Sequence, residues 1–316
     1  MKHYEMPPCV RKTTIGGQAI LEGISMKGPR TTCVTVRKPD GTLEFMERPT
    51  PTPKHWFWKL PVARGAYTLF TAMKDGVGDI NYSAQFFEDE DSVDTEPSRF
   101  ERWLEAHVSS DKLEKVLMGF AMIIGTLLPI ALFLVAPTLI VGILPDDSPY
   151  FVRSLLEGLV RIVLFFLFMW SISHMKDIER TFRYHGAEHK TIFCYEAGLP
   201  LTVENVRNMP RFHPRCGTSF LIVVMIIPIL IFAFVQMDNV WLRMALRLLL
   251  LPVVIGLAYE CNRFAGRHDG IISRAIRWPG LQMQRLTVFE PDDSMIEVAI
   301  AAMERVIPPD DSDAWK

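Results

Sequence analysis

The chain alternates between polar segments and long apolar runs, and the apolar runs gather in its middle. Four stretches, residues 116–144, 151–173, 219–237 and 241–259, each have about the 20 residues that a helix needs to cross a bilayer. No charged residue interrupts the first of them, whereas a helix of a soluble core would carry charges at helical spacing. The pattern predicts an α-helical integral membrane protein with four transmembrane helices, two in residues 116–173 and two in residues 219–259.

Composition supports this fold class. The 316 residues are 49% hydrophobic and 22% charged, and the formal net charge is -2. Such apolar content is unusual for a soluble enzyme. The long apolar runs lead us to expect membrane lipid among its partners. Because the chain has no block of lysine and arginine with interleaved aromatic residues, we expect no nucleic acid among them.

Basic residues predict the orientation of the spans. The middle loop, residues 174–218, contains seven lysines and arginines, while the short links "PDDSPY" and "DNV" contain none. Cytoplasmic loops carry the excess of these residues. We therefore predict a multi-pass protein of the cell (plasma) membrane with this loop and both termini in the cytoplasm.

Five charged residues fall inside the predicted second and fourth spans: Arg153, Glu157, Arg161, Arg243 and Arg247. Their spacing of four places each set on one helix face. Two interpretations follow, a polar seam between the two helices or shorter spans whose arginines reach the outer headgroups.

Residues 1–59 predict a small β-rich cytoplasmic segment. "TTCVTVRKPDGTLEFMERPT" alternates apolar and polar residues around a turn signal, which predicts a hairpin over about residues 32–47. Before it, "IGGQAILEGISMKGP" brackets a short apolar run with glycines, so we expect sharp bends around Gln18 and Glu22. Polar side chains at bends are frequent in binding sites, and these two are the candidate substrate-binding residues.

Residues 60–115 predict an interfacial helix, at 60–87, followed by an acidic linker. Residues 260–316 predict a cytoplasmic C-terminal segment. There, "RWPGLQMQRLTVFEPDD" predicts a loop because of its proline and glycine, and an amphipathic helix follows, capped by Asp292 or Asp293. The buried stripe expected for this helix consists of Met295, Val298, Ala299 and Ala302.

The stretch "RYHGAEHKTIFCYE" carries the strongest chemical signal. If residues 177–196 are helical, His185 and His189 project from one face with Glu188 beside them. Two imidazoles at this spacing can bind one Zn²⁺, with Glu188 as the catalytic general base for the attacking water. "HGAEH" matches the H-x-x-E-H pattern of inverted zinc proteases, although five residues also match by chance. The opposing interpretation is a histidine pair that only faces lipid headgroups.

A metal site needs further ligands, and "HPRCGTS" supplies His213 and Cys216 just before the predicted third span. Glu196 and Glu260 are alternative acidic ligands. If only one of His213 and Cys216 joined His185 and His189, the metal would keep the open position of a catalytic site. If both joined, they would complete the four ligands of a structural zinc site. The predicted cofactor is zinc or another divalent transition metal.

Four segments carry a family resemblance: "GGQAILEGISMKGP", "RYHGAEHKTIFCYE", "HPRCGTSFL" and "WPGLQMQRLTVFEPDDSMIEVAIAA". In this order, over nearly the whole chain, they resemble the signature segments of a bacterial and plastid membrane family catalogued as domain of unknown function 1385. Members usually read "EGVMMRG" where this chain has Ser25 and Lys27 and retains Glu22. The resemblance implies a predicted metal-dependent enzyme and names no substrate.

These observations lead to one leading functional hypothesis. We predict a membrane-embedded metal-dependent hydrolase that acts at the cytoplasmic membrane face on a lipid-linked or membrane-peptide substrate. The alternative is a non-catalytic membrane assembly or binding protein with a structural zinc site. A transporter that uses the charged seam is the third hypothesis.

Overall fold

The structure is a computed structural model that describes residues 9–87, 123–125, 127–145, 148–232 and 240–315. The chain divides into two compact units. The first holds residues 1–87, 169–230 and 237–316, and the second holds residues 88–168 and 231–236. The predicted acidic linker after residue 87 and the start of the predicted first span, residues 116–122, lie outside the described residues.

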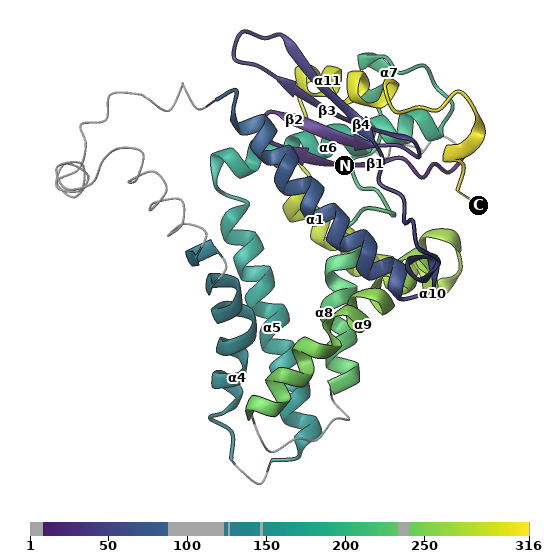
Figure 1. The fold of residues 1–316 in the computed structure, drawn as a ribbon. Helices are drawn as coiled ribbons and strands as arrows, with labels where there is room; N and C mark the ends of the chain where they lie inside the picture. The colour runs from purple at the N-terminus through teal and green to yellow at the C-terminus, as the bar shows by residue number, and fades with distance from the viewer. Residues whose placement is uncertain (1–8, 88–122, 126, 146–147, 233–239, 316) are drawn as a thin grey trace, which may run out of the picture. The chain divides into compact units, whose positions relative to one another are not determined.

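A four-stranded antiparallel sheet opens the first unit (Figure 1), in the order β1 (Gly16–Ile20), β2 (Gly23–Lys27), β3 (Thr31–Arg37) and β4 (Leu43–Pro49). The predicted hairpin is confirmed as β3 and β4. Its turn contains Gly41 with a φ of 83°, the left-handed conformation that glycine adopts without strain.

The segment before that hairpin is a second hairpin, β1 and β2. The expectation of a bend at Gln18 is wrong, because Gln18 pairs with Ser25 in the middle of β1. Only Glu22 lies at a bend, in the two-residue turn, with a φ of 47°. A Cβ atom on Gly23 would lie 2.4 Å from the carbonyl oxygen of Thr35. This glycine therefore allows close strand pairing and does not end the strand.

Helices cover both faces of the sheet. One face contributes Ile24, Met26 and Cys33 to the main core. On that face pack α6 (Lys176–Glu196) and α11 (Asp293–Glu304). The other face buries Ile20, Val34 and Val36 against the residues at the end of α1 (Ala63–Ala84), namely Tyr82, Phe86 and Phe87. The short elements are η1 (Trp56–Lys59), α7 (Val203–Arg207) and η3 (Asp311–Asp313).

The C-terminal amphipathic helix is confirmed as α11. Asp292 is its N-cap, and the Asp292 side chain accepts a hydrogen bond of 3.0 Å from the backbone N–H of Met295. All four residues of the predicted stripe are fully buried. The amphipathic period was therefore sufficient to place this helix and the face that it buries.

One predicted loop is a helix. α10 (Ile271–Thr287) continues through Pro279 and Gly280, where sequence analysis placed an interruption. Buried contacts stabilise it, because the Gln284 side chain accepts from the N–H of His213 at 2.8 Å and donates to the carbonyl of His213 at 2.7 Å. Gly280 lies directly against Ser219. Tertiary packing overrides the local helix-breaking tendency of proline and glycine here.

Three helices of the described chain are long and apolar enough to cross a membrane: Ile123–Val141, which includes η2 (Ala131–Val135) and α4 (Ala136–Val141); α5 (Tyr150–Ile172); and Leu248–Arg267 of α9 (Val240–Arg267). The predicted third span corresponds to α8 (Thr218–Phe232), which is apolar but has only 15 described residues. These helices are compatible with a membrane protein, and the count of four spans stays a prediction.

The charged residues of α5 form contacts with groups of the second unit. Glu157 accepts a hydrogen bond from Thr138 and pairs with Arg161 at 3.2 Å. Arg161 also donates to the carbonyl of Phe133 at 2.7 Å. The predicted seam would also need Arg243 and Arg247, whose side chains lie outside what the structure describes.

The predicted interfacial helix is confirmed as a helix, α1. One side of it is an exposed apolar stripe of Phe70, Met73, Val77 and Ile80. The spacing of three and four residues aligns these side chains along the helix. Location of this stripe at a membrane surface remains a prediction.

We expect Gly280→Ala to lower the thermal unfolding temperature of the detergent-solubilised protein. A Cβ atom there would lie 2.5 Å from the backbone Cα of Ser219, so α8 and α10 would have to separate. Overpacking of this kind costs about 1–3 kcal/mol. The matched control is Gly78→Ala in α1, where no atom lies within 4 Å. The control should be neutral or slightly stabilising, and equal unfolding temperatures for the two variants would contradict the packing described.

Candidate functional site

The candidate site is built on α6, which confirms the predicted helix over residues 177–196. Glu188 and His189 are buried, and His185 is half-buried beside them. The three side chains lie at the spacing that places them on one side of the helix.

The segment that follows α10 runs along this side of α6. The N–H of Phe289 donates to the carbonyl of Phe182 at 3.0 Å, and Lys190 forms an ion pair with Glu290. A Cβ atom on Gly186 would lie 2.0 Å from the carbonyl oxygen of Phe289. Only glycine fits at this position, which explains the residue that follows the first histidine of "HGAEH".

Backbone carbonyls fix the orientation of both histidine rings. The Nδ1 atom of His185 lies 2.9 Å from the carbonyl oxygen of Thr287, and the Nδ1 atom of His189 lies 2.6 Å from that of Arg211. A carbonyl oxygen can only accept, so each Nδ1 carries a proton, and each Nε2 is the position open to a second proton or to a metal ion. Metal-binding histidines are typically held in this way.

The two Nε2 atoms converge with the thiol of Cys216. The Nε2 atom of His185 lies 3.2 Å from the Cys216 Sγ atom. Among the described residues, the Nε2 atom of His189 is buried and has no hydrogen-bond partner. One ligand atom from each of these three residues lies within 4.8 Å of the others. Nitrogen and sulfur ligands of a tetrahedral zinc ion are separated by roughly 3.3 to 3.6 Å, so the arrangement is compatible with a metal ion.

Electrostatics favour the ligand form of the cysteine. Burial opposes ionisation of Cys216, but the neighbouring rings of His189 and His185 lower the pKa of its thiol well below the ordinary value. Burial lowers the pKa of His185, but the Cys216 thiolate outweighs this and raises it to about 9. The same pocket that stabilises a thiolate next to an imidazolium would stabilise it next to a metal cation.

Glu188 lies beside this group and is not one of its three members. Its carboxylate accepts a hydrogen bond of 2.8 Å from the backbone N–H of Gly17 in β1. Its Oε2 atom lies 4.0 Å from the Nε2 atom of His185. Burial raises the pKa of the Glu188 carboxyl, which is the change expected of a general base that works near neutral pH.

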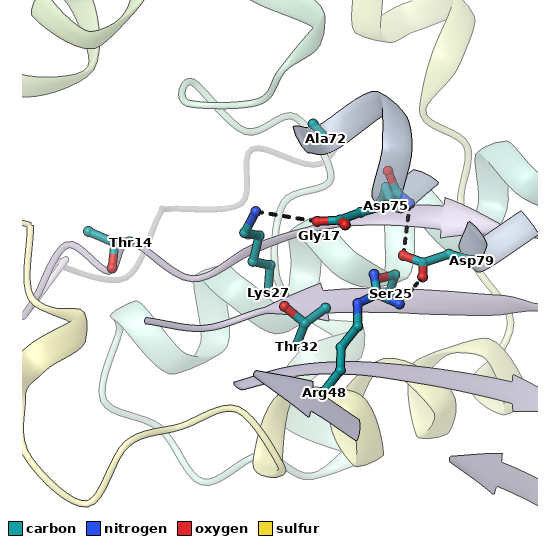
Figure 2. A pocket seen from close by; sticks show the side chains of 11 residues that line it. Thr14, Gly17, Ser25, Lys27, Thr32, Arg48, Ala72, Asp75 and Asp79 are labelled. Carbon is teal, nitrogen blue, oxygen red and sulfur yellow. Dashed lines mark hydrogen bonds and ion pairs between the residues drawn. The ribbon is translucent and has the colours of Figure 1, made fainter. Parts of the chain in front are cut away.

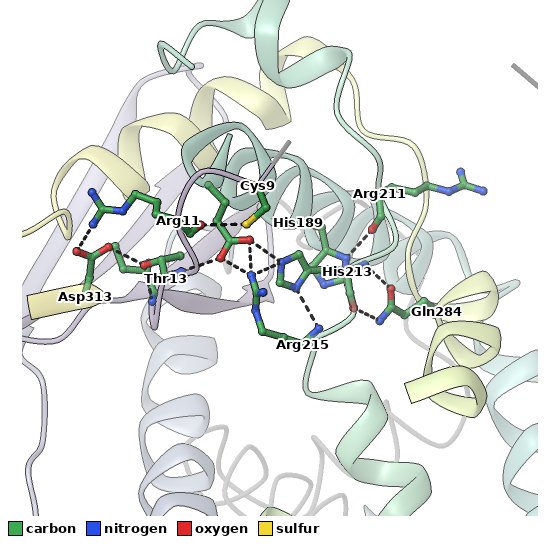
Figure 3. A network of polar contacts seen from close by, with 11 residues as sticks. Cys9, Arg11, Thr13, His189, Arg211, His213, Arg215, Gln284 and Asp313 are labelled. Carbon is green, nitrogen blue, oxygen red and sulfur yellow. Dashed lines mark hydrogen bonds and ion pairs between the residues drawn. The ribbon is translucent and has the colours of Figure 1, made fainter. Parts of the chain in front are cut away.

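His213 lies in a polar network around Glu196, which Figure 3 draws together with His189 and Arg211. Its Nε2 atom lies 3.7 Å from Glu196, whose carboxylate is bound by Arg215 and by the N–H of Thr13. The rings of His213 and His189 are 5.5 Å apart between centroids. His213 is therefore close to the group of three residues but faces Glu196. Burial lowers the pKa of His213 to about 4.

The remaining predicted residues lie elsewhere. Glu22 accepts hydrogen bonds from Arg180 at 2.6 Å and from Tyr184 at 3.2 Å, so its carboxylate holds the β1–β2 turn against α6. Glu260 pairs with Arg64 of α1. The structure places neither carboxylate in the group formed by His185, His189 and Cys216.

An apolar cavity of about 540 Å³ borders the site and is lined by His185, Cys216 and Gln18 together with residues of α1, α8 and α9. A second, polar cavity of about 240 Å³ shares Gly17, Gln18 and Ala72 with it. In the polar cavity Arg48 pairs with Asp79, and Lys27 lies 3.9 Å from Asp75 (Figure 2). Of the two predicted substrate-binding residues, Gln18 thus lines both cavities.

The groups that position His185, His189 and Glu188 were not predicted from the sequence. Gly17 contributes a backbone N–H, and Thr287 and Arg211 contribute carbonyl oxygens. Such backbone contributions leave no residue-type signal. Gln284 lies in one of the four segments that carry the family resemblance, so the sequence could have marked it as a candidate. Its hydrogen-bond partner could not be predicted from the sequence.

Comparison with known proteins agrees with the sequence resemblance. The family profile described as "Protein of unknown function (DUF1385)" matches residues 60–308. The chain belongs to this family. A relative from Bacillus subtilis (strain 168), described as "Uncharacterized protein YqhQ", is 31% identical over 313 residues, which cover 97% of this chain and 95% of that protein. No solved structure matches. Membership in DUF1385 carries no activity, so the chemical argument rests on the site.

A test of the His213 environment follows from its lowered pKa. An unfolded histidine takes up a proton near pH 6.5, while folded His213 stays neutral down to about pH 4. The unfolded state therefore binds more protons across this window, and stability falls as the pH falls. The effect is on the order of 3 kcal/mol.

We expect His213→Asn to flatten the dependence of the unfolding temperature on pH between 6.5 and 4.5. The exposed His268 offers the control His268→Asn, which should keep the wild-type slope. An unchanged slope in His213→Asn would contradict the buried, neutral state of this ring.

Proposed function

We propose that this DUF1385 protein is a metal-dependent hydrolase at the cytoplasmic face of the cell membrane. His185, His189 and Cys216 hold the metal, for which zinc is the best fit, and Glu188 is the general base. The substrate is lipid-linked or a membrane peptide.

One observation carries this proposal. Two imidazoles have their Nδ1 atoms held by backbone carbonyls, and their Nε2 atoms approach a thiol whose pKa is lowered. The buried Nε2 atom of His189, which has no partner among the described residues, would leave a desolvated acceptor unsatisfied without a ligand. Nitrogen and thiolate ligands in this number suit Zn²⁺.

A catalytic role is supported by the number of ligands. Structural zinc sites have four protein ligands, and catalytic sites have three and an open position. Among the residues that the structure describes, three candidate ligands are brought together, because His213 faces Glu196. The apolar cavity reaches His185 and Cys216, which gives a substrate access to that position.

The residues can then be given roles. A bound zinc ion would polarise the substrate oxygen and activate water. Glu188 takes the proton from the attacking water and returns it to the leaving group. The N–H of Gly17 holds the carboxylate in place for this transfer. Gln18 lines the substrate cavity, and Glu22 positions the strand that contains Gly17 and Gln18.

Membrane location is supported by the three apolar helices and by the exposed stripe of α1. We place the middle loop, and with it α6, on the cytoplasmic side because of its seven basic residues. The reaction would then take place where apolar helices meet the cytoplasm.

Single substitutions should separate the ligands from their neighbours. We expect His189→Ala and Cys216→Ser each to lower zinc affinity at least tenfold, because even loss of groups that only orient ligands costs about 10–100-fold. His213→Asn should retain wild-type zinc content. The measurement is elemental analysis of purified protein after dialysis against a weak chelator. Loss of zinc in His213→Asn would make His213 a ligand and favour the structural site.

Glu188→Gln tests the chemistry apart from the architecture. The amide keeps the size and can still accept from the N–H of Gly17, so zinc content and unfolding temperature should remain near wild type. Complementation of a deletion strain should be lost, because general-base catalysis is typically worth about 10²–10⁴-fold. Glu204→Gln, at an exposed carboxylate of α7, is the control and should complement. Full complementation by Glu188→Gln would favour the non-catalytic alternative.

A further inference from the structure

The free edge of the sheet faces the candidate metal site. β1 is an edge strand, paired only with β2 among the described strands. The N–H of Gly17 points away from β2, because it donates to Glu188. In an antiparallel pair, alternate residues direct their backbone groups to the same side. The N–H and C=O of Ala19 and the C=O of Gly17 therefore also point away from β2.

The hairpin register agrees with this assignment. Ile20 pairs with Gly23 across the two-residue turn, and Gln18 pairs with Ser25. The residues that flank a two-residue turn exchange hydrogen bonds with each other. Gly16, Gln18 and Ile20 therefore bond to β2, which leaves Gly17 and Ala19 on the free edge.

This edge lines the apolar cavity. Gly17, Gln18 and Ala19 form one wall, and His185 and Cys216 lie in the same cavity. The other walls contain the apolar side chains of Leu69, Phe182, Phe220 and Leu221, together with the uncharged polar residues Thr68, Thr181, Thr218, Tyr259 and Asn262. The described lining residues include no lysine, arginine, aspartate or glutamate. Leu221 is exposed, so the cavity reaches the outer surface of an uncharged helix.

We propose that β1 is a docking strand and that the substrate is a polypeptide with apolar side chains, which adds to the free edge as an extended strand. The identification of the substrate class rests on the hydrolase proposed above. Edge-strand addition supplies affinity through backbone hydrogen bonds, and pockets select the side chains. The walls formed by Leu69, Phe182, Phe220 and Leu221 would select apolar side chains.

A peptide fits this edge better than an acyl chain does. An alkyl chain laid along β1 would cover the N–H and C=O of Ala19 without hydrogen-bonding to them, which costs free energy. A peptide backbone offers the matching acceptor and donor. The N–H of Gly17, two residues before Ala19 on the same edge, holds the Glu188 carboxylate. Strand addition would therefore also align the peptide with the general base.

The reaction balances with water alone. The oxygen of water bonds to the carbonyl carbon of the scissile peptide bond, and Glu188 accepts a proton from that water. The C–N bond then breaks, and the proton passes from Glu188 to the leaving nitrogen. The products are a new carboxyl terminus and a new amino terminus.

The test uses zinc-loaded full-length protein in lipid nanodiscs and synthetic probes. The first probe is an acetyl-capped peptide of four leucines that ends in a hydroxamate, and its matched carboxamide lacks the metal-binding group. A series of each carries one N-methyl group on successive backbone nitrogens. Dodecanoyl hydroxamate represents an acyl lipid. Binding is measured by calorimetry.

Binding affinity should alternate along the series of N-methylated peptides. N-methylation at every second position should weaken binding roughly five- to tenfold, because it removes one hydrogen bond to the edge, and methylation at the positions between should have little effect. The substitution Ala19→Pro removes the edge N–H that would donate to a peptide carbonyl, so it should weaken the binding of every peptide roughly five- to tenfold, while the alternation, which reports donation by the peptide N–H groups, persists. Ala19→Ser keeps the N–H and should preserve both the affinity and the alternation. Zinc content should stay unchanged in both variants.

Two outcomes separate failure of the docking strand from failure of the hydrolase. If dodecanoyl hydroxamate binds as tightly as the peptide and N-methylation has no effect, the docking strand is wrong and an acyl lipid replaces the peptide. If hydroxamate and carboxamide peptides bind equally but the alternation persists, β1 is a docking strand and the metal-dependent hydrolase is wrong. An alternating pattern with tighter hydroxamate binding supports both.

Discussion

Two hydrogen bonds determine the candidate site, those that join the Nδ1 atoms of His185 and His189 to the carbonyl oxygens of Thr287 and Arg211. They connect α6 to the end of α10 and to the loop before α8, so three separate segments must pack before both rings are oriented. The contact of Gly186 with Phe289 and the ion pair of Lys190 with Glu290 hold the end of α10 against α6. A site assembled in this way is preorganised, because its ligands keep one orientation before a metal binds.

The same packing separates two functions among neighbouring polar residues. Glu196 draws His213 and Arg215 into a buried network that also binds Thr13, near the N-terminus of the chain. His185, His189 and Cys216 are left with one another. Because buried charges must be paired, Glu196 and Arg215 satisfy each other within this network, while the thiol and its two imidazoles remain available for a cation. His213 and Cys216 are thus close in sequence, but their side chains lie in two different environments.

Residue type and period predicted what depends on local chemistry. The alternation around "PDG" placed β3 and β4, and Asp292 with its apolar stripe placed α11. The i, i+4 spacing placed His185 and His189 together on a helix. Backbone partners could not be predicted, because a carbonyl such as that of Arg211 is present at every residue. The helix through Pro279 was missed for a related reason, since the contacts of Gln284 with His213 and of Gly280 with Ser219 join positions distant in sequence.

X-ray absorption at the zinc edge tests the central claim most directly, because it counts the atoms around the metal in the full-length protein. The account predicts two imidazole nitrogens, one sulfur and one further light atom from solvent, with distances of about 2.0–2.1 Å to nitrogen and about 2.3 Å to sulfur. Substitution of Cys216 by serine should remove the sulfur contribution. A shell of three imidazoles without sulfur, or one that keeps its sulfur in Cys216→Ser, would contradict the site described.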